Sequence, residues 1–178
     1  IPKKDFEFEA LRSTLGPVIT VIKPKTLQDA GYLSNCNIHI KQLYDYKTFT
    51  SYQDELKYLV LDDSRITYIS SMIQSISSNG NTLVLVDRVN AGKRLCELLD
   101  NSVFVSGSMK VEDRKVHYDS ISTEQNKVIV ATYHVAAVGI NMVNIYNVVL
   151  LEPGKSFVRV IQSIGRGMRK SSTKTHVD

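Results

Sequence analysis

The sequence predicts an α/β fold in which a mostly parallel sheet is covered by helices on both faces. Short, largely apolar runs recur at residues 82–86, 127–131 and 148–151. Strands that are apolar on both sides are typical of sheets buried on both faces. Segments with a helical spacing of apolar residues separate these runs, and this alternation favours parallel strands. The chain has 178 residues, 43% of them hydrophobic, which is enough for one domain with a substantial core.

The first third of the chain predicts a strand followed by two helices. We expect the strand at residues 38–43 and the helices at 51–61 and 63–78. Isoleucines recur at helical spacing in the second helix and define its buried side: Ile66, Ile69, Ile73 and Ile76. The aromatic group Tyr44, Tyr46, Phe49 and Tyr52 is interpreted as core or linker packing, and base stacking is the alternative.

We divide the chain into two parts. Residues 1–50 form a lead-in that includes the first strand of the domain, and residues 51–178 form the domain itself. The chain begins at Ile1 without a methionine, and residues 174–178 resemble a strand that is cut short. We therefore expect an excised fragment whose C-terminal end is truncated.

The remaining elements continue the alternation of strands and helices. The predicted order is strand 82–86, helix 89–99, strand 103–105, a charged helix to 121, strand 127–131, a short helix to 139, strand 148–151 and a last helix beyond Pro153-Gly154. Leu95, Leu98 and Leu99 are the expected buried side of the helix at 89–99. Ligands on parallel sheets bind at the carboxyl ends of the strands. The residues that follow the strands are therefore expected to gather at one edge: Asp87, Gly107, Thr132 and Glu152.

The most informative segment is 162–169, Gln-Ser-Ile-Gly-Arg-Gly-Met-Arg. On a helix, positions three, four and seven apart share a face. One face then carries Arg159, Gln162, Arg166 and Arg169, and the opposite face carries Phe157, Ile161, Ile164 and Met168. Guanidinium groups match phosphate geometry bidentately, and Gly165 lets a backbone or ligand come close. The segment predicts a phosphate-binding surface; the alternative is an ordinary amphipathic helix with a solvated basic face.

Charge and cysteine content narrow the class of protein further. The net charge of +4 and the pI near 9.0 fit an anionic partner. Cys36 and Cys96 belong to no metal-ligand spacing, so we expect buried free thiols in a reducing compartment and no metal site. No apolar run is long enough to span a bilayer.

Four segments in order resemble the motifs of the second RecA-like domain of superfamily 2 helicases and translocases. They are 82–88 (similar to motif IV), 107–114 (motif IVa), 130–141 (motif V) and 162–169 (motif VI). The resemblance implies a RecA-like three-layer fold. The lead-in at residues 15–33 resembles the segment that joins the two motor domains of this family. The sequence contains no Gly-x-x-x-x-Gly-Lys-Ser/Thr phosphate-binding loop. Gly92-Lys93 does not form one, since it is followed by arginine and lacks the glycine-rich segment before it.

The resemblance implies roles for individual residues. Arg166 and Arg169 would be arginine fingers, and Gln162 would position one of these arginines or the attacking water. Gly139, Asn141 and Gly165 would lie at the nucleotide cleft, although Asn141 stands where an aspartate is common. Thr132, Ser108 and Arg88 would contact a nucleic-acid backbone. The alternatives are a helix cap at Thr132, a tight turn at Gly139 and a solvated cation at Arg88.

The function implied is that of one half of a motor. ATP and Mg²⁺ would be held mainly by an N-terminal RecA-like domain of the same protein, and this chain alone should be inactive. The expected activity is an ATP-dependent helicase or translocase acting on single-stranded or branched DNA, or on RNA–DNA hybrids, in recombination, repair and replication. Such a protein would act in the cytoplasm, that of the host if phage-encoded. The alternatives are a non-catalytic nucleic-acid-binding module and the motor half of a restriction or remodelling enzyme.

Overall fold

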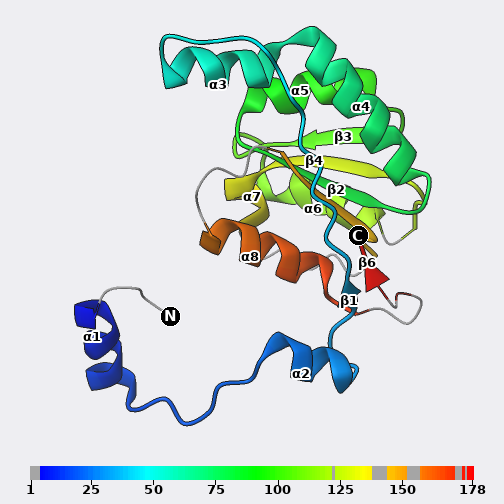
Figure 1. Cartoon of the computed structure of the whole chain (residues 1–178). Coiled ribbons are helices and arrows are strands. Elements are labelled where there is room, and N and C mark those ends of the chain that lie inside the picture. Colours follow the sequence, from blue (N-terminus) through cyan, green and yellow to red (C-terminus); the bar gives the residue numbers. More distant parts are fainter. Residues whose placement is uncertain (1–4, 122, 138–143, 152–156, 171–173, 175) are drawn as a thin grey trace. The chain divides into compact units, whose positions relative to one another are not determined.

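The computed structural model describes residues 5–121, 123–137, 144–151, 157–170, 174 and 176–178 (Figure 1). The chain divides into two compact units, Ile1–Leu33 and Ser34–Asp178. The smaller unit contains α1 (Asp5–Leu15) and α2 (Pro24–Asp29). A proline in the first turn starts α2, where its missing N–H costs no hydrogen bond.

The larger unit is built around four parallel strands in the order β3-β4-β2-β5. These strands are β2 (Thr82–Val86), β3 (Ser102–Val105), β4 (Val128–Thr132) and β5 (Asn147–Leu150). The two central strands, β2 and β4, are buried along their whole length. The helices of this unit are α3 (Tyr52–Leu61), α4 (Asp63–Ser77), α5 (Val89–Leu98), α6 (Val111–Ser120), α7 (Tyr133–Ala137) and α8 (Phe157–Gly167). The α/β architecture expected from the sequence is confirmed.

Helices cover both faces of this sheet. Successive side chains of a strand point to opposite faces, and in β2 and β4 the side chains on both faces are buried. Val84 and Val86 pack on the face covered by α4 and α5, in one cluster with Ile73 and Leu95. Leu83 and Leu85 pack on the other face, in a cluster that includes Tyr133 of α7. Figure 1 shows α4 and α5 on one side of the sheet and α6, α7 and α8 on the other.

Two further short strands form a separate two-stranded sheet next to β5. β1 (Asn35–Cys36) pairs in parallel with β6 (His176–Val177). Next to β6, the Asp178 N–H donates to the Tyr146 carbonyl at 2.9 Å, and the Val148 N–H donates to the Asp178 carbonyl at 2.7 Å. The tail therefore lies between β5 and β1, and it joins residues from both ends of the larger unit.

Two local expectations were wrong, and a third was narrowed. No strand forms at residues 38–43; the strand lies earlier, at β1, and Ile38 and Ile40 are exposed. Leu98 is 40% exposed, because Ala91, Gly92 and Leu95 supply the buried face of α5 instead. For the aromatic group, core packing is excluded at Tyr44, Tyr46 and Tyr52, which are 66–98% exposed, whereas the ring of Phe49 packs 5.1 Å from that of Tyr58.

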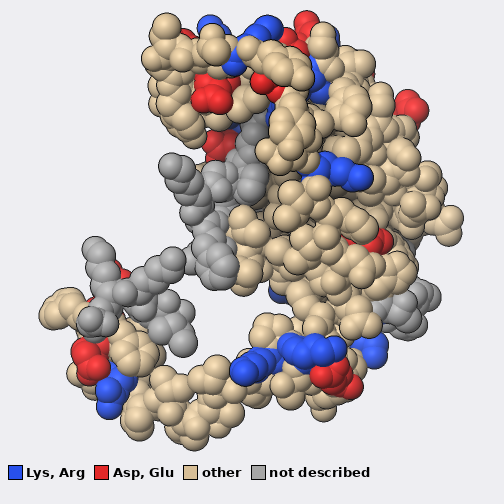
Figure 2. Space-filling view, viewed as in Figure 1, with Lys and Arg blue, Asp and Glu red and all other residues tan. Residues whose placement is uncertain are grey.

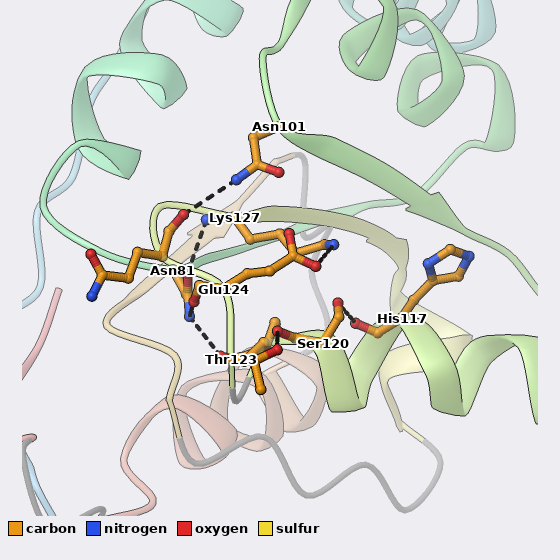
Figure 3. Close-up of polar contacts among 9 residues, drawn as sticks. Asn81, Asn101, His117, Ser120, Thr123, Glu124 and Lys127 are labelled. Carbon is orange, nitrogen blue, oxygen red and sulfur yellow. Dashed lines mark hydrogen bonds and ion pairs between the residues drawn. The ribbon is translucent and has the colours of Figure 1, made fainter.

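Buried asparagines connect the loops at the amino ends of the strands. The Asn81 side chain donates to the carbonyls of Ile121 and Glu124, both at 3.0 Å, and accepts from the Lys127 N–H at 2.9 Å. Figure 3 shows Asn81 close to Glu124 and Lys127. Asn147 acts similarly, donating to the Gly80 carbonyl and the Thr82 hydroxyl. These bonds fix the end of the sheet opposite to the predicted binding edge.

Candidate nucleotide and nucleic-acid interface

The residues predicted to contact nucleic acid lie at one edge of the sheet. Arg88 and Ser108 follow β2 and β3, and Thr132 ends β4. Val86 pairs with Thr132 in the sheet, and Val105 pairs with Ala131. The carboxyl ends of three neighbouring strands therefore meet at this edge, as the sequence predicted.

The exposure of these three residues differs. Arg88 and Ser108 are exposed, whereas Thr132 is only 7% exposed. A ligand can thus reach the cation and the serine hydroxyl more easily than the threonine side chain.

A second serine, which the sequence interpretation missed, orients the loop after β3. The hydroxyls of Ser106 and Ser108 lie 2.8 Å apart, and Ser106 is 8% exposed. The Met109 N–H donates to the Ser106 carbonyl at 3.2 Å. The buried serine therefore holds the exposed hydroxyl in place. The Ser-x-Ser spacing directly after a strand was the available signal.

The predicted arginine helix corresponds to α8. Gln162 is exposed on it, and a Cβ added at Gly165 would meet no heavy atom within 4 Å. The surface at these two positions is open, as a phosphate-binding face requires. Arg166 lies in the same helix four residues after Gln162, but its side chain lies outside the described residues, as do Gly139 and Asn141 entirely. Arg169 follows the end of the helix and is half-buried.

The buried face of α8 differs from the apolar stripe that was predicted. Ile161 is 51% exposed, whereas Ser163 is 6% and Met168 is 8% exposed. A Cβ added at Gly167 would lie 2.6 Å from Cγ2 of Val148 in β5 and 3.1 Å from Cγ2 of Val177 in β6. The helix end packs closely on these strands, and this close approach places small residues in the interface.

A buried lysine holds the carboxyl end of α8. Lys174 is 1% exposed, and its ammonium group donates to the carbonyls of Gly167 and Ile145. Burial lowers the pKa of this lysine to about 8. The Ser34 N–H donates to the Met168 carbonyl at 2.9 Å. The backbone just before Arg169 is therefore fixed from both ends of the larger unit.

The geometry described above agrees with the comparisons to known proteins. Residues 64–171 match the family model described as the helicase conserved C-terminal domain, which is more than half of the chain. The chain belongs to this helicase family. The resemblance to the second motor domain of superfamily 2 helicases is thereby confirmed.

Two viral relatives support the assignment of this helicase C-terminal domain. The chain is 28% identical over 171 residues to the ATP-dependent DNA helicase uvsW of Enterobacteria phage T4. The aligned region covers 90% of this chain and 34% of the relative. The chain is 32% identical over 145 residues to putative helicase 22 of a Sulfolobus islandicus filamentous virus, covering 67% of this chain and 26% of the relative. The chain thus spans about a third or less of these relatives.

Solved structures agree with the fold of the helicase domain. The crystal structure of T4 UvsW matches with a TM-score of 0.60 at 29% identity, over 72% of this chain and 27% of that one. The Mycobacterium smegmatis helicase Lhr, solved with single-stranded DNA and AMP-PNP, matches with a TM-score of 0.52 at 18% identity, over 61% of this chain and 16% of that one. The RecA-like fold is therefore shown, and the T-even phage helicase UvsW is similar to this chain in both sequence and fold.

The described part of the helicase domain contains groups that could bind the phosphates of a nucleotide. The side-chain amide of Gln162 and the guanidinium of Arg169 can donate to phosphate oxygens, and the open space at Gly165 lets such a group approach the helix. No group of three or more His, Cys, Asp or Glu side chains that could hold a metal ion occurs among the described residues. Nor does the described part contain a helix long and apolar enough to cross a membrane.

Proposed function

We propose that this chain is the C-terminal motor domain of an ATP-dependent DNA helicase or translocase. The family and the relation to ATP-dependent helicases are established by the family match and the relatives. The observation that carries the proposal further is the arginine helix α8, which has an open surface at Gln162 and Gly165 and a backbone that is fixed just before Arg169.

In this proposal Arg166 and Arg169 act on a nucleotide that is held mainly by an N-terminal RecA-like domain of the same protein. Their guanidinium groups bind the β- and γ-phosphates when the two domains close, and Gln162 orients an arginine or the attacking water. Mg²⁺ bound with ATP neutralises charge that develops on the phosphates. Gly139, Asn141 and Gly165 lie at the nucleotide cleft and couple nucleotide state to domain closure.

The nucleic-acid side of the proposal uses the carboxyl edge of the sheet. Arg88, Ser108 and Thr132 contact a phosphodiester backbone there, which fixes the position of the strand without reading its sequence. The relative's description as a DNA helicase favours DNA. Branched DNA and RNA–DNA hybrids, in recombination, repair and replication, are the substrates that we propose.

The proposal also assigns the rest of the chain and its location. Residues 1–50 are the lead-in that joins the two motor domains, and residues 51–178 are the second motor domain. The similarity to a phage protein supports a location in the cytoplasm of the host cell.

The arginine fingers can be tested in the full-length protein by measuring ATP hydrolysis with saturating single-stranded DNA. We expect Arg169→Ala and Arg166→Ala each to lower turnover by about 10³-fold or more, because arginine fingers contribute roughly 10³–10⁵ in rate. Affinity for DNA should remain within a few-fold of the wild-type value. Lys170→Ala is the matched control, since Lys170 is a neighbouring exposed cation.

Three outcomes would contradict this proposal. Turnover of Arg169→Ala within a few-fold of the wild-type rate, at an unchanged melting temperature, would exclude a finger at this position. Appreciable ATP hydrolysis by the 178-residue chain alone would contradict a motor that needs two domains. Salt-sensitive DNA binding with no response to nucleotide in the full-length protein would indicate a non-catalytic binding module instead.

A further inference from the structure

A groove of about 690 Å³ lies between α3 and the carboxyl end of β2. Its α3 wall includes Gln53 and Lys57, and its other wall includes Arg88 and Asn90. Figure 2 shows positive and negative side chains together over α3. Because Arg88 belongs both to this groove and to the sheet edge described above, the two surfaces are continuous.

The cations of this groove are available to a ligand. Lys57 and Arg88 are both exposed, and within the described part of the chain neither forms an ion pair. The acidic residues of the groove are engaged instead. Asp54 accepts from the Ser51 hydroxyl at 2.6 Å, and Asp87 also interacts with other groups. Asp54 and Asp87 keep their negative charge, but of the four charged side chains that line the groove only Lys57 and Arg88 make no ion pair or hydrogen bond within the described part of the chain.

The start of α5 adds further donors to the same wall. Arg88 is the N-cap of this ten-residue helix, its side chain makes no capping bond, and the first turn contains no acidic residue. The first backbone N–H groups of such a helix have no partner within the helix and carry a partial positive charge. The start of α5 and the two cations, Lys57 and Arg88, therefore all contribute positive potential to the groove.

The α3 wall is held in a fixed position. Ser51 caps α3 by accepting from the Asp54 N–H, and Val60 packs the helix inward at 2% exposure. On the outer side, the Tyr58 hydroxyl donates to Asp45, and the ammonium of Lys47 lies 4.0 Å from the centre of the Tyr58 ring. A preformed wall reduces the ordering cost of binding.

We propose that this groove binds the phosphodiester backbone of a single nucleic-acid strand, with Lys57 and Gln53 of α3 as contacts additional to those of the sheet edge. The proposal rests on the proposed function, because a motor domain needs a path for the strand. A lysine supplies a point charge to a phosphate, and an amide supplies a hydrogen-bond donor. Val60, Leu61 and Val89 line the remainder of the groove and can contact the sugars.

The test measures binding of a fluorescein-labelled 20-nucleotide oligothymidylate to the 178-residue chain by anisotropy, across a series of KCl concentrations. Removing one phosphate contact makes the slope of log K against log salt less negative by about 0.7 for a single strand. We expect this change in Lys57→Gln, with Kd raised several-fold at low salt. Lys57→Arg, which keeps the charge, should retain the wild-type slope.

Lys93→Gln is the matched control, because Lys93 is an exposed lysine of the neighbouring helix α5 and does not line the groove. Equal slopes for Lys57→Gln and the wild-type chain would overturn the proposal, and so would an equal loss in Lys93→Gln. Displacement of the oligonucleotide by polyglutamate at the same charge concentration would indicate an acidic protein partner instead. Failure here is distinguishable from failure of the proposed function, since Arg169→Ala is assayed by turnover and leaves the salt slope unchanged.

Discussion

The substitution Asn81→Ala should destabilise the larger unit substantially, because Asn81 is 4% exposed and makes three side-chain hydrogen bonds to backbone groups. Each such bond contributes about 1 kcal/mol net, so the three together give about 3 kcal/mol. Domains of this kind have unfolding free energies of roughly 5–15 kcal/mol. The loss would therefore be a large share of the total, and the melting temperature should fall by roughly 6–12 °C at about 2–4 °C per kcal/mol.

Urea denaturation followed by circular dichroism measures this change in the 178-residue chain. Asn101→Gly is the matched control: Asn101 is exposed, its side chain makes one bond to the Gln125 carbonyl at 3.2 Å, and its φ of 47° suits glycine. The control should change the free energy of unfolding by less than about 1 kcal/mol. If Asn81→Ala and Asn101→Gly cost the same, the asparagine network does not hold the strand ends together.

Two further predictions concern close packing and a buried charge. Gly92→Ala should destabilise the domain by about 1–3 kcal/mol, because the new Cβ would lie 2.1 Å from Cε2 of Phe104. Gly165→Ala should instead raise the melting temperature, because this position of α8 faces open space and alanine favours the helix. The free energy of unfolding should rise between pH 8 and 10, because the pKa of Lys174 is lowered to about 8 in the folded chain and the unfolded chain therefore binds the extra proton. Lys174→Met should remove that part of the rise in urea titrations, and a wild-type slope in this variant would contradict the argument.

The sequence was sufficient for features that depend on local pattern. The strands β2, β4 and β5 are short apolar runs, and the burial of β2 and β4 on both faces follows from this composition, whereas β5 is only partly buried. The edge that gathers Arg88, Ser108 and Thr132 follows from the parallel topology. The order of the four motifs along the chain was sufficient for the family.

Features that depend on distant contacts were not predictable in this way. Lys174 appears in the sequence as an ordinary surface lysine, and only its contact with Ile145, 29 residues away, shows that it is buried. The apolar stripe of α8 was misjudged because close packing on β5 and β6 favours Gly167 and Ser163 over Ile161. At residues 38–43 the local pattern suits a strand, but a strand also needs a hydrogen-bonding partner.

The position of β6 between β5 and β1 has a consequence for the order of folding. Asn35 pairs with His176, 141 positions later in the chain, so this pairing is among the most distant contacts in the larger unit. Contacts of such long sequence separation form late, because the loop must close first. During synthesis, β5 would therefore have an unpaired edge until the tail leaves the ribosome. Unpaired edges invite association with other chains, so this stage is the one at which the nascent domain is most exposed to aggregation.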